Sequence, residues 1–367
     1  MFAIVVSALL SCVGAYAAQP QASPISHHEG AEDPLWAPPE LIAFVKSRVL
    51  MFESERGRAE ALLRLLVLPE HVGGLGIEYS NDKTRTINEV WLDRKANCVS
   101  LTFMYVALAK QLRINAVFAE SIEAINWSRV GGVIRMEKHM VAVIHQHPGT
   151  DLVADFLPQT RTRYGNYFVN IITTARARSV YYSNSAVEAF IANDKETAAE
   201  RIQMALEADP TSYQAWNIKG VIEKSYGKTL DAMRSYSNAI RCNPNNVVAI
   251  GNLAGLYRSE GFFEEAAKLR AIENNLRRRD PYYLAFLASE ALENNNFREA
   301  EKLLKRAIKI HPADANFYIT LSHIYGAQNK MSQAVDALAK ARSYATPDKI
   351  ADLDLLLQGF SASMIPK

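Results

Sequence analysis

A single cysteine stands where a polar stretch of the chain gives way to a long apolar run. In "DRKANCVSLTFMYVALAKQL", residues 93–112, Cys98 directly precedes side chains that are apolar on nearly every side of a helix. This run predicts a largely buried helix with Cys98 in its first turn. Free backbone N–H groups and the helix dipole favour the thiolate there, and the thiolate is the nucleophilic form of cysteine. The alternative is a small core residue, and a base elsewhere in the chain decides between the two.

A histidine and an aspartate further along the chain are candidates for that base and its partner. The segments "KHMVAVIHQ" and "DLVADF" alternate as strands do, and the "HPG" between them is typical of a turn. If the loop is the five residues 145–149, Ile144 pairs with Thr150 and His139 lies opposite Asp155. Cross-strand partners point to the same face, with Cβ atoms roughly 5 Å apart. The carboxylate would fix the imidazole tautomer, and the imidazole would take the proton of Cys98.

The order of cysteine helix, histidine strand and aspartate strand resembles the transglutaminase-like domain of the papain-type cysteine enzymes. The matching segments, within residues 88–169, are "NCVSLTFMYVALAKQLRINAVF", "KHMVAVI" and "DLVADF". The resemblance implies Cys98 as nucleophile, His139 as general base and Asp155 as its orienting partner.

The chain departs from the pattern of that family at three places near the proposed triad. Ala96 stands where a glycine usually precedes the cysteine, Met140 replaces the usual aromatic residue after the histidine, and the proline after the aspartate comes only at Pro158. These departures leave the acyl acceptor and the substrate cleft open.

The elements around the triad predict an α+β domain over residues 35–178. "PPELIAFVKSRVLMF" and "GRAEALLRLLVLPE" have helical patterns and precede the cysteine helix. The segments "NAVFAESI", "KHMVAVIHQ", "DLVADFL" and "NYFVNII" follow it and read as strands. Helices first and an antiparallel sheet afterwards are typical of the α+β class.

The second half of the chain contains an internal repeat. Small residues recur at position eight of units that start near 179, 213, 247, 281 and 315: Ala186, Gly220, Ala254, Ala288 and Ser322. Position 20 is alanine in every unit: Ala198, Ala232, Ala266, Ala300 and Ala334. Position 27 is also alanine except in the third unit, which has Glu273. Small side chains recur because the helices of neighbouring units cross there at close approach.

This pattern resembles the tetratricopeptide repeat, a 34-residue helix-turn-helix unit, in five copies over residues 179–346. The resemblance implies an all-α superhelix whose concave face binds a protein or peptide. The third unit is long, which predicts an extended second helix around residues 274–279. Residues 347–367 are expected to form a capping helix and tail that close the open end of the core.

The first residues, "MFAIVVSALLSCVGAYAAQPQASP", are apolar and uncharged through Ala18 and then turn polar. They predict a signal peptide, residues 1–17, that ends at the small-residue site "AYA", with residues 18–34 as a linker. "LLSC" also resembles the bacterial lipobox, which would make Cys12 a lipid anchor. Both cuts imply export, to the bacterial periplasm or as a membrane-tethered lipoprotein.

Composition and the remaining motifs narrow the function further. A formal net charge of +2 over 367 residues predicts no nucleic-acid partner. Three cysteines, at 12, 98 and 242, exclude a disulfide scaffold. His145 and His147 lack a matching cysteine or carboxylate pair, and the glycine-rich residues 73–79 lack the strand and helix of a phosphate loop. We therefore predict no metal and no cofactor.

Two functions remain. The first is acyl transfer by the Cys98 thiol, as a peptidase, amidase or transglutaminase-like enzyme, with a partner bound by the repeats. The alternative is a non-catalytic scaffold in which the repeats bind the partner and the α+β domain only docks. The two are distinguished by the reactivity of Cys98, because a catalytic thiolate is alkylated at a lower pH than an ordinary cysteine.

Overall fold

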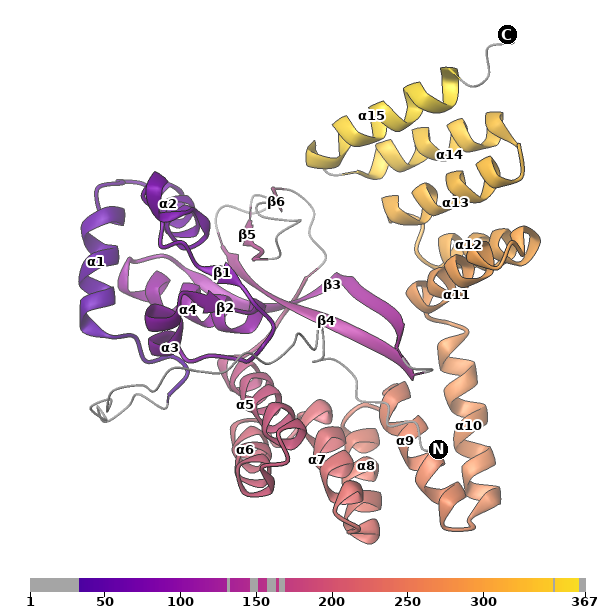
Figure 1. Cartoon of the computed structure of the whole chain (residues 1–367), viewed down its shortest axis with the longest axis horizontal. Coiled ribbons are helices and arrows are strands. Elements are labelled where there is room, and N and C mark those ends of the chain that lie inside the picture. The colour runs from indigo at the N-terminus through magenta and orange to yellow at the C-terminus, as the bar shows by residue number, and fades with distance from the viewer. Residues whose placement is uncertain are drawn as a thin grey trace. The chain divides into compact units, whose positions relative to one another are not determined.

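The computed structural model describes residues 33–130, 133–145, 151–156, 163–164, 169–345 and 347–362. They form two compact units. The amino-terminal unit comprises residues 33–125 and 137–246, and the carboxy-terminal unit comprises residues from 247 onward with strand residues 126–130 and 133–136. Figure 1 labels the elements of both units.

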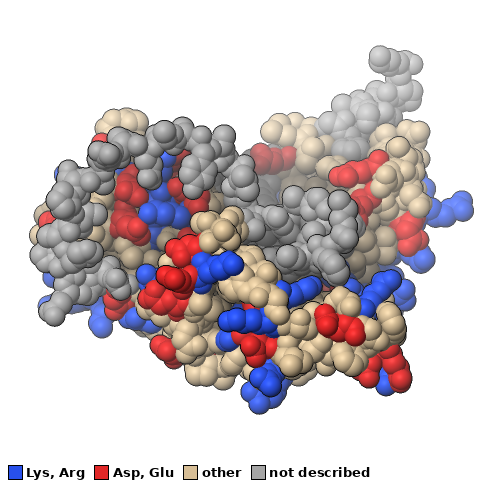
Figure 2. Space-filling model, turned by 60° about the horizontal axis from the view of Figure 1, so that its bottom comes forward, with Lys and Arg blue, Asp and Glu red and all other residues tan. Residues whose placement is uncertain are grey.

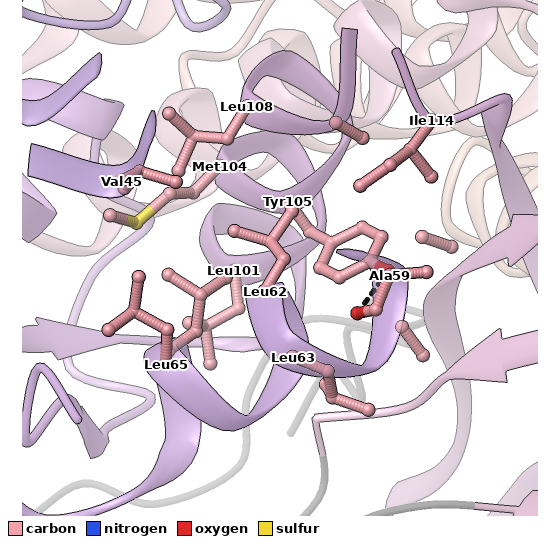
Figure 3. Close-up of a cluster of buried hydrophobic side chains, with 14 of the residues drawn as sticks. Val45, Ala59, Leu62, Leu63, Leu65, Leu101, Met104, Tyr105, Leu108 and Ile114 are labelled. Atoms are coloured by element: carbon pink, nitrogen blue, oxygen red, sulfur yellow. Dashed lines mark hydrogen bonds between the residues drawn. The ribbon is translucent and has the colours of Figure 1, made fainter. Parts of the chain in front are cut away.

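Three helices of the amino-terminal unit enclose an apolar core. They are α1 (Pro39–Val49), α2 (Glu55–Val67) and α4 (Cys98–Gln111). Helix α4 is buried along most of its length, as its apolar run predicts. Figure 3 shows Leu101 and Met104 of α4 packed among leucines of α2, and the hydroxyl of Tyr105 donating to the carbonyl oxygen of Ala59 at 3.0 Å. This core fixes the helix that begins with Cys98.

Short elements precede α4 and hold its first residue. After the 3-10 helix η1 (Glu70–Val72), strand β1 (Glu78–Tyr79) pairs in parallel with β2 (Lys95–Ala96), and helix α3 (Ile87–Asp93) connects them. A complete capping box starts α3: Thr86 accepts from the N–H of Glu89, and the Glu89 carboxylate accepts from the N–H of Thr86. The chain thus arrives at Cys98 along a short strand that is itself hydrogen-bonded.

A five-stranded sheet follows, with the order β6-β5-β4-β3-β7. Its strands are β3 (Ala116–Val130), β4 (Val133–Ile144), β5 (Leu152–Ala154), β6 (Arg163–Tyr164) and β7 (Val169–Ile171). Strand β7 pairs with β3, β5 with β4 and β6 with β5, all antiparallel. The long strands β3 and β4 lie side by side in Figure 1.

The register of β4 and β5 differs from the one expected. Ile144 pairs with Leu152 and not with Thr150, so the ladder is shifted by two residues. Since side chains alternate with a period of two, a shift of two keeps every residue on its expected face. His139 and Asp155 therefore still share a face.

The boundary expected between 178 and 179 falls inside a helix. Helix α5 (Thr174–Ile191) runs through it, and its Tyr181 and Tyr182 share a buried cluster with Phe103 of α4 and Phe118 of β3. The ring centroids of Phe103 and Tyr181 are 5.5 Å apart. The α+β elements and the first repeat helices therefore have a common core.

Ten further helices continue the array. They are α6 (Lys195–Ala208), α7 (Tyr213–Ser225), α8 (Thr229–Cys242), α9 (Val247–Ser259), α10 (Phe263–Arg277), α11 (Pro281–Glu293), α12 (Phe297–Ile310), α13 (Ala315–Ala327), α14 (Met331–Tyr344) and α15 (Pro347–Ala362). The first helices of the second to fifth units start where the repeat predicts. Helix α15 is the expected terminal helix, and its Leu353 is buried with Tyr318 and Leu338.

The recurring small residues lie at close helix crossings. The position-20 alanines are 0–5% exposed. At Gly220 a Cβ atom would come within 2.7 Å of the ring of Tyr236, so only glycine fits at that crossing.

The exception at position 27 has a structural reason. Glu273 is 3% exposed, and its carboxylate forms ion pairs with Arg270 and Arg277, both at 2.7 Å. It faces Gly251, where a Cβ atom would lie 2.8 Å from the Glu273 oxygen. The third unit thus keeps its helices close by placing the small residue on the facing helix. Its second helix, α10, ends at Arg277, within the extension expected around residues 274–279.

Replacing Ala300 by Leu is expected to lower the free energy of unfolding by roughly 1 to 3 kcal/mol, because a fully buried crossing has no room for the longer side chain. Arg298→Leu places the same side chain at an exposed position of the same helix and serves as the control. Chemical denaturation of the two variants checks the difference. Equal stabilities would contradict close packing at Ala300.

The expected signal peptide, the lipobox with Cys12 and most of the linker lie outside the described residues, as does His147. None of the helices in the described ranges combines the length and the apolar character that a membrane span needs.

Candidate functional site

His139 and Asp155 form a buried hydrogen-bonded pair. Strand β4 carries His139, and Asp155 directly follows β5. The His139 Nε2 and Asp155 Oδ1 atoms are 2.6 Å apart, and the residues are 5% and 1% exposed. In the observed register these residues are diagonal neighbours and not direct partners, which long side chains still span. A carboxylate at this position orients the ring and stabilises its protonated form.

Cys98 lies at the start of α4, where its side chain remains partly exposed. Asn97 caps the helix by accepting a hydrogen bond from the N–H of Ser100 at 2.9 Å. One turn further, the Thr102 hydroxyl lies 2.7 Å from the carbonyl oxygen of Cys98 and 3.2 Å from that of Met140. Because Met140 follows His139, these contacts join the first turn of α4 to the histidine strand.

The surroundings of Cys98 favour its thiolate. Burial raises the pKa of Cys98, but the charge and hydrogen bonding of His139, the N–H of Met140 and the hydroxyl of Tyr79 together lower it below its ordinary value. Burial lowers the pKa of His139, yet the Cys98 charge and the bond to Asp155 raise it overall. Each shift favours the charged form of its group. Both shifts therefore favour a thiolate beside an imidazolium over the neutral pair.

Tyr79 is a site residue that the sequence did not reveal. Parallel pairing of Tyr79 with Ala96 brings its side chain beside Cys98, and burial followed by the neighbouring Cys98 charge raises the pKa of the phenol. The hydroxyl therefore stays neutral and can donate to the Cys98 sulfur, and the exposed Asn81 also hydrogen-bonds with it. Strands of two residues are too short to show alternation, so no sequence pattern pointed to this contact.

The structure thus brings the three predicted residues, Cys98, His139 and Asp155, together within the amino-terminal unit. Cys98 and Cys242 are both free thiols. His145 lies 3.4 Å from Asp151, and among the described residues no group of three or more His, Cys, Asp or Glu side chains is arranged to hold a metal ion.

Acidic and basic side chains alternate over the face drawn in Figure 2, in keeping with the near-balanced charge of the chain. Among the described residues in this view, lysines and arginines form no continuous stripe of the kind that is typical of nucleic-acid binding.

Comparison with known proteins identifies the repeats. A tetratricopeptide repeat model matches residues 291–353. No curated protein is similar enough in sequence to count as a relative. Similar solved structures include Pseudomonas aeruginosa PilF (14% identity, 52% of this chain and 100% of that one, TM-score 0.28) and yeast Tom70 (19%, 51% and 40%, 0.32). YrrB, described as a TPR protein with an unusual peptide-binding site, is also similar (18%, 49% and 92%, 0.26).

These matches cover about half of the chain or less. The matched residues begin in the last turn of α11 and include all of α12, α13 and α14. The family model therefore covers helices of the repeat array. The chain contains a tetratricopeptide repeat domain, an architecture typical of protein interaction scaffolds.

Proposed function

We propose that this chain is a repeat-based interaction protein that also carries a thiol acyl-transfer site of the transglutaminase-like kind. The repeats bind a protein or peptide partner, and Cys98, His139 and Asp155 act on an acyl group. One observation carries the enzymatic half of the proposal: a buried His–Asp pair with 2.6 Å between its atoms stands beside a partly exposed cysteine whose pKa is lowered.

The proposed reaction follows from the charges of these groups. The Cys98 thiolate attacks the carbonyl carbon of an amide and forms a tetrahedral adduct. The C–N bond then breaks, the His139 imidazolium gives its proton to the leaving amine, and a thioester remains. Water or a second amine attacks the thioester and gives a proton to His139. The C–S bond then breaks and the Cys98 thiolate leaves, which restores the starting thiolate and imidazolium. Asp155 holds the ring in place throughout.

Hydrolysis makes the protein a peptidase or amidase, and attack by an amine makes it an acyltransferase.

Tyr79 also belongs to the proposed site. Its hydroxyl donates a hydrogen bond to the Cys98 thiolate before attack, and this hydrogen bond is lost once the sulfur becomes part of the thioester.

The alternative, a non-catalytic scaffold, is favoured by the repeat domain itself, since such repeats bind partners without chemistry. A Cys98→Ala variant distinguishes the two. If Cys98 is catalytic, the variant keeps partner binding in a pull-down and loses turnover of a peptide amide substrate. If the chain is only a scaffold, cells that carry Cys98→Ala behave as wild type. Cells whose protein lacks residues 247–367 then behave as if the whole protein were absent.

Export remains part of the proposal. Residues 1–17 as a signal peptide, or Cys12 as a lipidated residue, would bring the mature chain to the bacterial envelope, in the periplasm or tethered to a membrane. Fractionation of cells that express the full chain tests this, and Cys12→Ala separates the two forms. A tethered protein moves from the membrane fraction to the soluble fraction when Cys12 is replaced, whereas a soluble one does not change.

A further inference from the structure

One residue, Thr84, joins two distant elements in the loop between β1 and α3. Its hydroxyl oxygen accepts a hydrogen bond from Asn97 Nδ2 at 2.8 Å and another from Asn184 Nδ2 at 3.3 Å. Its backbone N–H donates to Glu188 Oε1 at 2.8 Å. Thr84, Asn97 and Asn184 are 6%, 7% and 1% exposed. Polar groups at this depth are costly to leave unpaired, so these hydrogen bonds constrain where the three segments lie.

On one side, Thr84 is held by the first repeat helix. Asn184 and Glu188 are one turn apart on α5, so their side chains lie on the same face of that helix. One contacts the hydroxyl of Thr84 and the other contacts its backbone. Both the backbone and the side chain of Thr84 are therefore hydrogen-bonded to α5.

On the other side, Thr84 reaches the residue directly before the nucleophile. The carboxamide of Asn97 donates to Thr84 and, through its oxygen, accepts from the N–H of Ser100. The Ser100 hydroxyl oxygen in turn accepts from the N–H of Arg85 at 2.7 Å. Adjacent loop residues thus hold both ends of the first turn of α4.

The loop is itself kept rigid by Arg85. Its guanidinium, 5% exposed, forms two hydrogen bonds of 2.7 Å with the Asp82 carboxylate and one of 2.9 Å with Asp93. A bidentate arginine–carboxylate pair fixes both groups in orientation as well as in distance. Thr84 therefore transmits the position of α5 to Asn97 through a segment with little freedom of its own.

We propose that Thr84 is a positioning residue that holds the first turn of α4, and with it the Cys98 thiol, against the first repeat helix, so that Cys98 reactivity depends on α5. The inference rests on the proposed function in one respect, which is that the Cys98 thiolate is the nucleophile.

The test is the pH dependence of Cys98 alkylation by iodoacetamide in the full chain, with the modified residue identified by peptide mass spectrometry. Thr84→Val keeps the shape of the side chain but leaves two buried amides without their acceptor. We expect its pH midpoint to move up by roughly one unit and its rate at pH 6.5 to fall about threefold. Thr84→Ser keeps the hydroxyl and should match the wild type.

Asn184→Ala approaches the same contact from the repeat helix and should shift the midpoint in the same direction. It decides the matter if Thr84→Val does not fold, as judged by circular dichroism. The proposal is overturned if the folded Thr84→Val profile coincides with that of the wild type, or if Thr84→Ser and Thr84→Val behave alike. His139→Ala, measured in parallel, tests the site itself: if it slows alkylation while Thr84→Val does not, only the positioning role fails.

Discussion

Replacing His139 by Ala is expected to slow the alkylation of Cys98 about tenfold at pH 6.5. The imidazolium lowers the pKa of Cys98, so its removal shifts the thiol toward its protonated form. Less thiolate is then present at this pH, and the greater nucleophilicity of a more basic thiolate offsets only part of that loss. Tyr79→Phe removes one weaker partner and should slow the reaction in the same direction by a smaller factor.

The matched control is His145→Ala, which removes a histidine just beyond the end of the same strand, where the ring faces Asp151 and not Cys98. Its rate should equal that of the wild type. Rates against pH, assigned to Cys98 by mass spectrometry, separate this thiol from Cys242. If His139→Ala and the wild type gave the same profile, the thiolate–imidazolium pair and the enzymatic half of the proposed function would both be wrong.

A chain that ends at residue 178 is expected to lose its cooperative unfolding transition. The cut removes most of α5 and with it Tyr181, Tyr182 and Ala186, which are buried against Phe103 and Phe118. Loss of one large buried aromatic side chain costs about 3 to 5 kcal/mol, and whole domains are stable by only about 5 to 15 kcal/mol. Removing two such side chains therefore exhausts most of the stability available.

A chain that ends at residue 246 keeps the complete amino-terminal unit and should unfold in one sharp transition. Thermal melts followed by circular dichroism at near-ultraviolet wavelengths compare the two fragments. A sharp transition in the shorter fragment would mean that the α+β elements form a core of their own and that α5 is dispensable to it.

The sequence predicted the repeats well because their signal is periodic and local. A small residue every 34 positions reports a helix crossing directly, and four of the first helices start at the expected residues. The position-27 exception could not be interpreted from one residue alone. Its explanation, the close approach of Glu273 to Gly251, involves two helices at once.

The candidate site was predictable in composition and not in detail. The sheet face on which a side chain lies depends only on whether its spacing along the strand is odd or even, and this placed His139 and Asp155 together. The pairing register of their strands nevertheless differed from the expected one by two residues. Tyr79 and Thr84 could not be found in this way. Each reaches the cysteine helix from a short loop element, and such contacts depend on tertiary packing and leave no periodic pattern.

The common core of α4, β3 and α5 also sets an order of events during synthesis. Residues 174–191 leave the ribosome well after Cys98, and Asn184 and Glu188 are needed before Thr84 has all its partners. A nascent chain that has grown only as far as the sheet therefore holds an incompletely anchored thiol. If Cys98 depends on α5 as proposed, its reactive form would arise only once translation has passed into the repeats.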